Sequence, residues 1–182
     1  LVNAYILIEI ILEKLMKIII SPAKRLDFET KPKVEAYTQP AFIKESEELI
    51  KILRKKSPED IKELMNISFD LAQLNFQRYA QWHLPFNAKQ DIFAFEADVF
   101  KAMDKENLSE EDFNYLQEKL RIISGLHGLL KPFDLIQPHR LEGGTKLENP
   151  KGANLYKFWN NKITELLETH MQNDSDSELL NL

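Results

Sequence analysis

The chain has 182 residues, of which 43% are hydrophobic and 29% are charged, with a net charge of -5 and no cysteine. This mixture is typical of a globular domain with a buried core, and the lack of cysteine excludes disulfides, zinc–thiolate centres and thiol nucleophiles. We therefore expect an intracellular, cytoplasmic protein. A protein that binds nucleic acid with its whole surface is usually basic, so any such binding here depends on positive charge gathered locally.

Residues 1–15 are mainly apolar, with Glu9 and Glu13 among them. They lack the basic region and the small-residue cleavage site of a signal peptide, and they are too short and too acidic to span a bilayer. Met16 is followed at once by a β-branched run, which is a plausible true start. We expect residues 1–15 to be an extension outside the domain, residues 16–182 to form the domain, and no membrane association. The alternative for the extension is a functional amphipathic helix.

The elements of the domain follow from hydrophobic periodicity and from capping residues. Ser57 before Pro58 marks one helix start, and Ser109 with Asp112 resembles a capping box. In chain order we expect a strand at 18–20, a loop over 24–40, helices over 41–56, 57–65 and 68–82, a strand at 91–95, a short helix over 97–103, a helix over 109–120, strands at 121–124 and 140–142, a long helix over 154–171 and the start of a strand at 179–182.

This order of elements predicts a mixed α/β fold of the α+β kind, with a central sheet flanked by helices in a single compact domain. The last residues, Leu179 to Leu182, have the composition of a buried strand, and the sequence stops there. We therefore expect the domain to be incomplete at its C-terminus.

The first segment that could carry chemistry follows the first expected strand, where α/β proteins place ligand loops. It contains Ser21, Lys24, Arg25 and Asp27. The two cations could hold a phosphate, Asp27 could orient one of them, and Ser21 could bind the same anion. The segment lacks the glycines of a P-loop. The alternative is a plain exposed loop.

The second segment contains Glu96 and Asp98, directly after the strand expected at 91–95. Two carboxylates in such a place could serve acid–base catalysis or bind a metal ion. The alternative is that Asp98 caps the helix that follows.

The third segment, residues 121–146, lies in a locally basic stretch. Between residues 117 and 151 there are six basic and four acidic side chains, a local charge of +2 in an acidic chain. Glycine amides that face a phosphate, flanked by Lys and Arg, can hold a nucleic-acid backbone without reading its sequence, with an affinity that falls steeply with salt. The candidate DNA- or phosphate-binding residues of the whole chain are Lys24, Arg25, Arg121, Gly125, Gly128, Lys131, Arg140 and Lys146.

Two histidines in this segment, His127 and His139, could bind iron or zinc together with nearby acids. Without cysteine or a His-x-His spacing, we predict no metal site and no cofactor. His83 and His170 lie in polar stretches, and we expect them at the surface. Trp82 and Trp159 have the spacing of helix faces that pack into a core.

The order of these segments resembles the YaaA family, which comprises bacterial proteins of the peroxide stress response. The resemblance runs from Met16 to Leu182. The blocks that carry it are Ile20–Lys24 with Leu26–Asp27, Ala94–Phe95 with Asp98–Phe100, Ser124–Asp134, Pro138–Glu142 and Leu155–Trp159.

The chain departs from the family pattern at four positions. Ala97 replaces a glycine, His127 and His139 stand where tyrosine is usual, and Gly143 stands where methionine is usual. An imidazole still forms hydrogen bonds, and it can gain charge near neutral pH. Asn181–Leu182 resembles the beginning of a further family block.

The resemblance implies a cytosolic bacterial protein that limits damage by hydrogen peroxide, in a family associated with lowering free iron and protecting DNA. It also implies a compact α/β unit with a positively charged cleft and a helix-hairpin-helix element, which we place at Ser124–Lys131. The leading hypothesis is therefore a stress protein that binds DNA by structure rather than sequence.

The rival hypothesis is an enzyme that acts on a nucleotide or nucleobase, with Ser21, Lys24 and Asp98 in its pocket. The chain contains no recognised catalytic motif. A third possibility, direct iron binding through His127, His139 and acids, is weaker than either.

Overall fold

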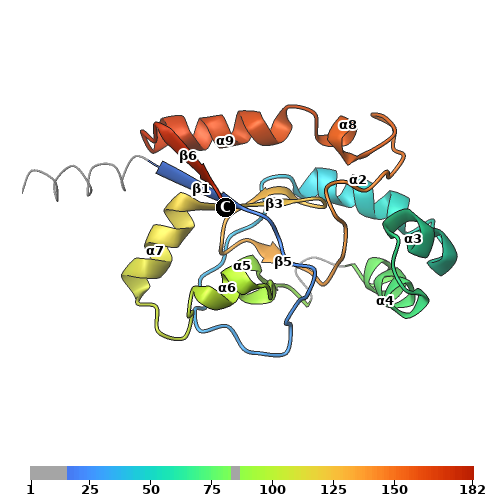
Figure 1. Ribbon diagram of the computed structural model, residues 1–182, viewed down its shortest axis with the longest axis horizontal. Helices are drawn as coiled ribbons and strands as arrows, with labels where there is room; N and C mark the ends of the chain where they lie inside the picture. Colours follow the sequence, from blue (N-terminus) through green and yellow to red (C-terminus); the bar gives the residue numbers. More distant parts are fainter. Residues whose placement is uncertain (1–15, 83–86) are drawn as a thin grey trace, which may run out of the picture.

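The computed structural model describes residues 16–82 and 87–182, so the expected extension at residues 1–15 and the expected surface residue His83 lie outside the described residues. Its main sheet has four strands in the order β4-β3-β1-β6 (Figure 1). β1 is parallel to β3 and β6, whereas β4 is antiparallel to β3, which confirms the mixed α/β fold class. The strands are β1 (Met16–Ile20), β3 (Leu120–Ser124), β4 (Gly128–Leu130) and β6 (Glu178–Asn181).

A second, two-stranded antiparallel sheet and a set of helices complete the described structure. The small sheet pairs β2 (Lys89–Gln90) with β5 (Leu135–Ile136). The helices are α2 (Ile43–Leu53), α3 (Pro58–Met65), α4 (Phe69–Ala80), α5 (Asp91–Ala94), α6 (Asp98–Ala102), α7 (Glu110–Lys119), α8 (Leu155–Trp159) and α9 (Lys162–Asn173). Within residues 16–82 and 87–182, no helix has both the length and the apolar character needed to cross a membrane.

The main sheet is covered on both faces, with α9 on one side and the short helices α5 and α6 on the other (Figure 1). Because side chains alternate along a strand, neighbouring residues of β1 enter different cores. Ile19 packs with Leu129 and Leu167 beneath α9. Ile20 packs with Ile122 against residues of α5 and α6. Burial on both faces explains why β1 ends in the β-branched run Ile18–Ile20.

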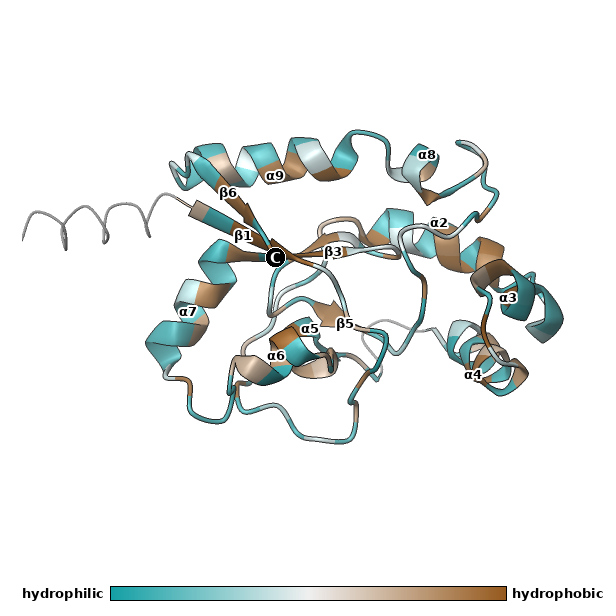
Figure 2. Cartoon of the chain, viewed as in Figure 1, coloured by the Kyte–Doolittle hydropathy of each residue, from teal (hydrophilic) through white to brown (hydrophobic). Residues whose placement is uncertain are grey.

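The helices α2, α3, α4 and α8 form a group beside the sheet, with its own core around Leu49, Leu53, Ile61 and Trp159. The expected helix start at Ser57 is confirmed: its side chain accepts the N–H of the third helical residue in a complete capping box. Figure 2 shows hydrophobic residues concentrated in β1, β3 and β6 and interspersed with hydrophilic ones along α2 and α9. This is the pattern of helices that cover a core on one side only.

Three expected elements were wrong. The strand at 91–95 is the helix α5, whose residues are nearly fully buried, and periodicity cannot separate a buried strand from a buried helical turn. The segment 140–142 joins no sheet. The long helix over 154–171 is broken at Asn160, which has a positive φ of 44°, so that α8 and α9 are separate.

Candidate phosphate-binding cleft at the end of the sheet

A cleft of about 540 Å³ lies at the C-terminal ends of the parallel strands β1 and β3. This edge of a parallel sheet is where α/β proteins bind their ligands. Ser21 and Lys24 line the cleft from the loop after β1, and Ser124 lines it from the end of β3. The segment 139–144, Tyr156 of α8 and Asn181 of β6 complete the wall. Segments that are distant in the sequence therefore converge on one hollow.

Two cations of the cleft share one carboxylate. Arg140 Nη2 donates to Glu142 Oε1 at 2.7 Å, and Lys24 Nζ lies 3.5 Å from Glu142 Oε2. The Lys24 side chain is 66% exposed and the Arg140 side chain 16% exposed. Arg140 Nε is buried and has no hydrogen-bond partner among the described residues. Lys24, Arg140 and Glu142 together therefore carry a net charge of one positive unit, and Arg140 Nε is a donor without a partner among the described residues.

Arg140 is fixed through its backbone. The Tyr79 hydroxyl of α4 donates to the carbonyl oxygen of Arg140. Burial raises the pKa of Tyr79 above its usual range, which keeps this hydroxyl protonated and a donor. The neighbouring Leu141 packs directly on Gly125, where a Cβ atom would collide with the Leu141 carbonyl oxygen. The cleft wall is therefore held from both sides by the helical group and by the loop after β3.

The glycines of the loop after β3 serve packing. Trp159 Nε1 donates to the carbonyl oxygen of Gly125 at 2.9 Å. Gly128 has a φ of +72°, and a Cβ there would lie 2.8 Å from the Phe42 ring. Both glycines are buried. By contrast, Gly143 and Gly144 line the cleft, and a Cβ at either would meet nothing within 4 Å.

The segment Ser124–Lys131 joins two antiparallel strands, β3 and β4, and is therefore a β-hairpin. The placement of a helix-hairpin-helix element at this segment was wrong. The physical reason is that the residues on either side of the turn extend the main sheet, where Ile122, Leu129 and Leu130 are buried in the cores on its two faces.

The structure separates the remaining basic candidates from the cleft. Arg121 is 2% exposed, and its Nε donates to His170 Nδ1 at 3.0 Å. Arg25 is exposed and lies 3.5 Å from a carboxylate oxygen of Glu96. Lys131 is half-buried and Lys146 is exposed, and neither lines the cleft.

Asp98 also lies outside the cleft, as an exposed residue at the start of α6. The helix cap is Ala97, which makes no side-chain capping bond, so the alternative in which Asp98 caps this helix was wrong. Of the three residues proposed for a nucleotide pocket, the structure brings together Ser21 and Lys24 only.

His127 and His139 lie side by side, with ring centroids 5.1 Å apart. His127 Nδ1 lies 3.1 Å from the Ser46 hydroxyl, and Trp82 stacks on its ring. His139 Nδ1 donates to the carbonyl oxygen of Gln137 at 2.8 Å, and its side chain reaches the cleft wall. Burial lowers the pKa of His139 to about 4 and that of His127 well below its usual range. Both imidazoles are therefore neutral at pH 7.

His170 was expected at the surface, but it is half-buried against Arg121. Burial, and then the charge of Arg121, lower its pKa to about 4. In the described part of the chain, no group of three or more His, Cys, Asp or Glu side chains is placed to hold a metal ion.

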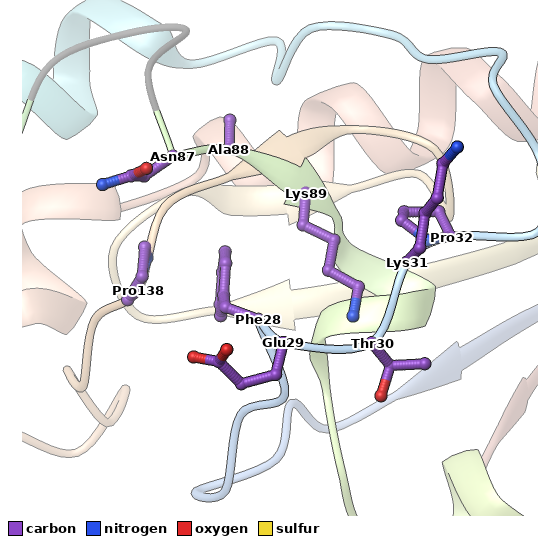
Figure 3. Close-up of a pocket in the computed structure, with 9 residues that line it drawn as sticks. All are labelled: Phe28, Glu29, Thr30, Lys31, Pro32, Asn87, Ala88, Lys89 and Pro138. Atoms are coloured by element: carbon purple, nitrogen blue, oxygen red, sulfur yellow. The ribbon is translucent and has the colours of Figure 1, made fainter.

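A second hollow, of about 510 Å³, is lined by Phe28, the loop 29–32 and residues 87–89, and Figure 3 shows Lys89 extending toward this loop. Lys89 Nζ is already engaged, because it donates to the Asp27 carbonyl oxygen at 2.9 Å. Asp27 itself is held by its loop: mainly the backbone N–H of Thr30 lowers its pKa to about 2. The Lys89 ammonium group, the most buried cation of this hollow, is therefore satisfied within the fold.

Sequence reasoning missed several cleft residues. Glu142, Gly144 and Tyr156 were not candidates, although Glu142 and Tyr156 stand in blocks that carry the family resemblance. Their positions in the sequence could have indicated them. Glu142 is two residues from Arg140, and Tyr156 is a tyrosine among three residues with the spacing of a helix face that packs into the core.

Comparison with known proteins gives a consistent result. A family model described as "Peroxide stress protein YaaA" matches residues 16–182. A UPF0246 protein of Aromatoleum aromaticum is 52% identical over 165 residues, which cover 89% of this chain and 63% of the relative. A UPF0246 protein of Dechloromonas aromatica is 49% identical, covering 92% of this chain and 66% of the relative. The chain thus spans slightly less than two thirds of the length of these relatives.

Proposed function

This chain belongs to the family of the peroxide stress protein YaaA, and we propose that it acts in the peroxide stress response by binding DNA phosphates in the cleft beside β1 and β3. In this role it limits iron-dependent oxidative damage by covering the DNA backbone, where a reactive iron ion would otherwise be held. The protein is acidic overall, so the interaction is confined to this cleft and is not spread over the surface.

One observation carries the proposal: Lys24 and Arg140 converge on the carboxylate of Glu142 in an open cleft at the ligand-binding edge of the sheet. A carboxylate and a phosphate offer the same oxygen acceptors to these donors. A phosphate that displaces the Glu142 carboxylate gains both of its cationic partners, Lys24 Nζ and Arg140 Nη2.

The test is fluorescence anisotropy of a labelled DNA duplex with the purified chain, at about 50 mM and about 200 mM salt. We expect Lys24→Ala and Arg140→Ala each to lower the affinity about tenfold at low salt, because each removes a charge-assisted hydrogen bond. Each should also make the salt dependence shallower.

Arg25→Ala is the matched control, since Arg25 adjoins Lys24 in sequence but lies outside the cleft. We expect a change of less than about twofold, because an exposed cation that is already paired contributes little. Absence of duplex binding, binding that ignores salt, or an equal loss in Arg25→Ala and Lys24→Ala would contradict the proposal.

A second candidate function is an enzyme acting on a nucleotide or nucleobase. The observation that favours it is that the same cleft gathers the Ser21 and Ser124 hydroxyls with the neutral imidazole of His139. Incubation with nucleotides, followed by chromatography of the products, tests it. A product that forms with the wild-type chain but not with the Ser21→Ala variant would support this candidate, and unchanged nucleotides would remove it.

A further inference from the structure

A smaller hollow of about 220 Å³ continues the cleft. It shares with the cleft Ile123, Ser124, Gly143 and Tyr156, so the two hollows form one groove. Its other walls are mainly apolar, because Leu155, Trp159 and Ile163 are among them. The groove therefore has a cationic half and an apolar half, which meet at Tyr156.

Tyr156 is the most exposed large apolar side chain in the described residues, with 71% of its surface accessible. The backbone at Tyr156 is held in place, because neighbouring residues anchor α8. Asn154 caps α8 by accepting the N–H of Lys157, and Phe158 and Trp159 are buried in the core of the helical group. A tyrosine ring held open to solvent beside two cations is the arrangement that proteins use to stack a nucleic-acid base.

The cationic half of the groove can admit a phosphate close to its backbone. Gly143 and Gly144 face open space, so a bound anion can approach the chain there without meeting a side chain. Lys24 and Arg140 flank the same space. Across the shared wall, Ile123 of β3 is 38% exposed and supplies an apolar surface beside Tyr156.

We propose that this groove binds a nucleoside phosphate whose base is unpaired, with the phosphate between Lys24 and Arg140 and the base against Tyr156 and Ile123. The inference rests on the proposed function for its phosphate site and adds the form of the ligand. A base inside a duplex is stacked on both faces and cannot reach the ring. A duplex therefore occupies the phosphate half alone, whereas an unpaired nucleotide of a DNA strand or a free nucleotide fills both halves of the groove.

The experiment compares two single-stranded DNA probes of equal length and charge, one normal and one with abasic sites at its central positions. We expect the wild-type chain to bind the normal strand roughly tenfold more tightly. Tyr156→Ala should remove this difference by weakening the normal strand alone, whereas Tyr156→Phe should retain it. Tyr37→Ala is the control, because Tyr37 is 62% exposed and lies outside both hollows.

A competition arm separates the two sources of the ligand. If deoxyadenosine monophosphate displaces the strand from the wild-type chain far better than inorganic phosphate, and this advantage is lost in Tyr156→Ala, the groove takes free nucleotides as well. If no oligonucleotide binds, the mononucleotide is titrated directly by calorimetry. Binding that is lost in Tyr156→Ala would then support this inference, although the proposed DNA-binding function would have failed.

Two results would overturn the inference. The first is equal affinity of the wild-type chain for the normal and abasic strands, and the second is an equal loss for both strands in Tyr156→Ala. Salt-dependent binding that needs Lys24 but not Tyr156 would leave the proposed function standing and remove the base subsite alone. Thermal melting of each variant checks that the exposed side chain is not needed for folding.

Discussion

The two ends of β1 carry charged residues in opposite states. At the N-terminal end, Lys17 is fully buried and pairs with Asp174 and Asp176, and Lys119 pairs with Asp176 at 2.7 Å. At the C-terminal end, the Lys24 side chain is two-thirds exposed and has only a long contact with the shared carboxylate in the cleft. The same strand thus connects a buried ion-pair network with an open cationic site.

This difference distinguishes charged side chains that are paired inside the fold from cations that can bind a ligand. In the buried network, carboxylates face both ammonium groups, and Lys17 also donates to the Glu118 carbonyl oxygen at 2.9 Å. Each of these two ammonium groups therefore already has a carboxylate partner within the fold. In the cleft, two cations face one carboxylate, and Arg140 Nε has no partner among the described residues. An exchange of the carboxylate for a ligand anion is possible only at this end.

The largest effect we expect is from Asp176→Ala. It leaves two buried ammonium groups without a full set of partners, which typically costs about 3–5 kcal/mol of the free energy of unfolding. Urea denaturation followed by circular dichroism measures it. The matched change at the other end, Glu142→Ala, should cost less, about 1 kcal/mol, because the Glu142 and Lys24 side chains are 44% and 66% exposed and water can take the place of the carboxylate. Equal losses at the two ends would show that the buried network is no more important to stability than the cleft.

Local sequence patterns were enough to predict much of this frame. β1, β3 and β6 were expected from their apolar runs, and the helix starts at Ser57 and Ser109 from their capping residues. The burial expected for β6 was wrong, because all four of its residues are exposed at the edge of the sheet. These features depend on neighbours within a few residues, so the sequence contains them directly. The strand expected at 91–95 failed because burial on all sides removes the periodicity that distinguishes strand from helix.

The candidate site was only partly predictable for the opposite reason. Lys24 and Arg140 were selected because they are cations in loops, and the structure brings them into one cleft. Arg121 has the same charge but is buried beside His170, a neighbour 49 residues away. A sequence shows which side chains are charged, but the partner that neutralises a charge usually comes from another part of the chain.

The next largest effect is a loss of stability at acidic pH. It distinguishes the neutral pair His127 and His139 near the cleft from the buried ion-pair network. Because the pKa of His139 is about 4 in the folded chain and about 6.5 when unfolded, the unfolded chain binds more protons between these values. The neutral His139 therefore contributes fully to the free energy of unfolding above pH 6.5. This contribution falls as the pH falls, by up to about 3 kcal/mol near pH 4.

Urea unfolding of the wild-type chain and of His139→Gln over this pH range isolates the contribution. The difference between the two proteins should shrink as the pH falls from 6.5 to 4, because only the wild type has the imidazole to protonate. His170 and the buried carboxyl groups titrate in both proteins and cancel in the difference. Arg78, whose charge also lowers the pKa of His139, remains cationic throughout. A constant difference at every pH would contradict the buried, neutral state of His139.

The smallest expected change in stability, and the most informative about binding, is Glu142→Gln. This substitution keeps the shape of the side chain but removes the charge that competes with a ligand for Lys24 and Arg140. Because the group is half-exposed, the free energy of unfolding should change by less than about 1 kcal/mol. The affinity for a DNA strand at low salt should rise by about threefold to tenfold, since one repulsive carboxylate is lost.

Glu96→Gln is the matched control, because Glu96 lies 3.5 Å from Arg25 and from Lys101 but does not line the cleft. It should leave the affinity unchanged within about twofold. If both substitutions raise the affinity equally, the chain responds to its net charge alone. If Glu142→Gln lowers the affinity, the carboxylate holds the two cations in position for the ligand and is not displaced by it. Only a rise confined to Glu142→Gln is consistent with an anion that takes the place of this carboxylate.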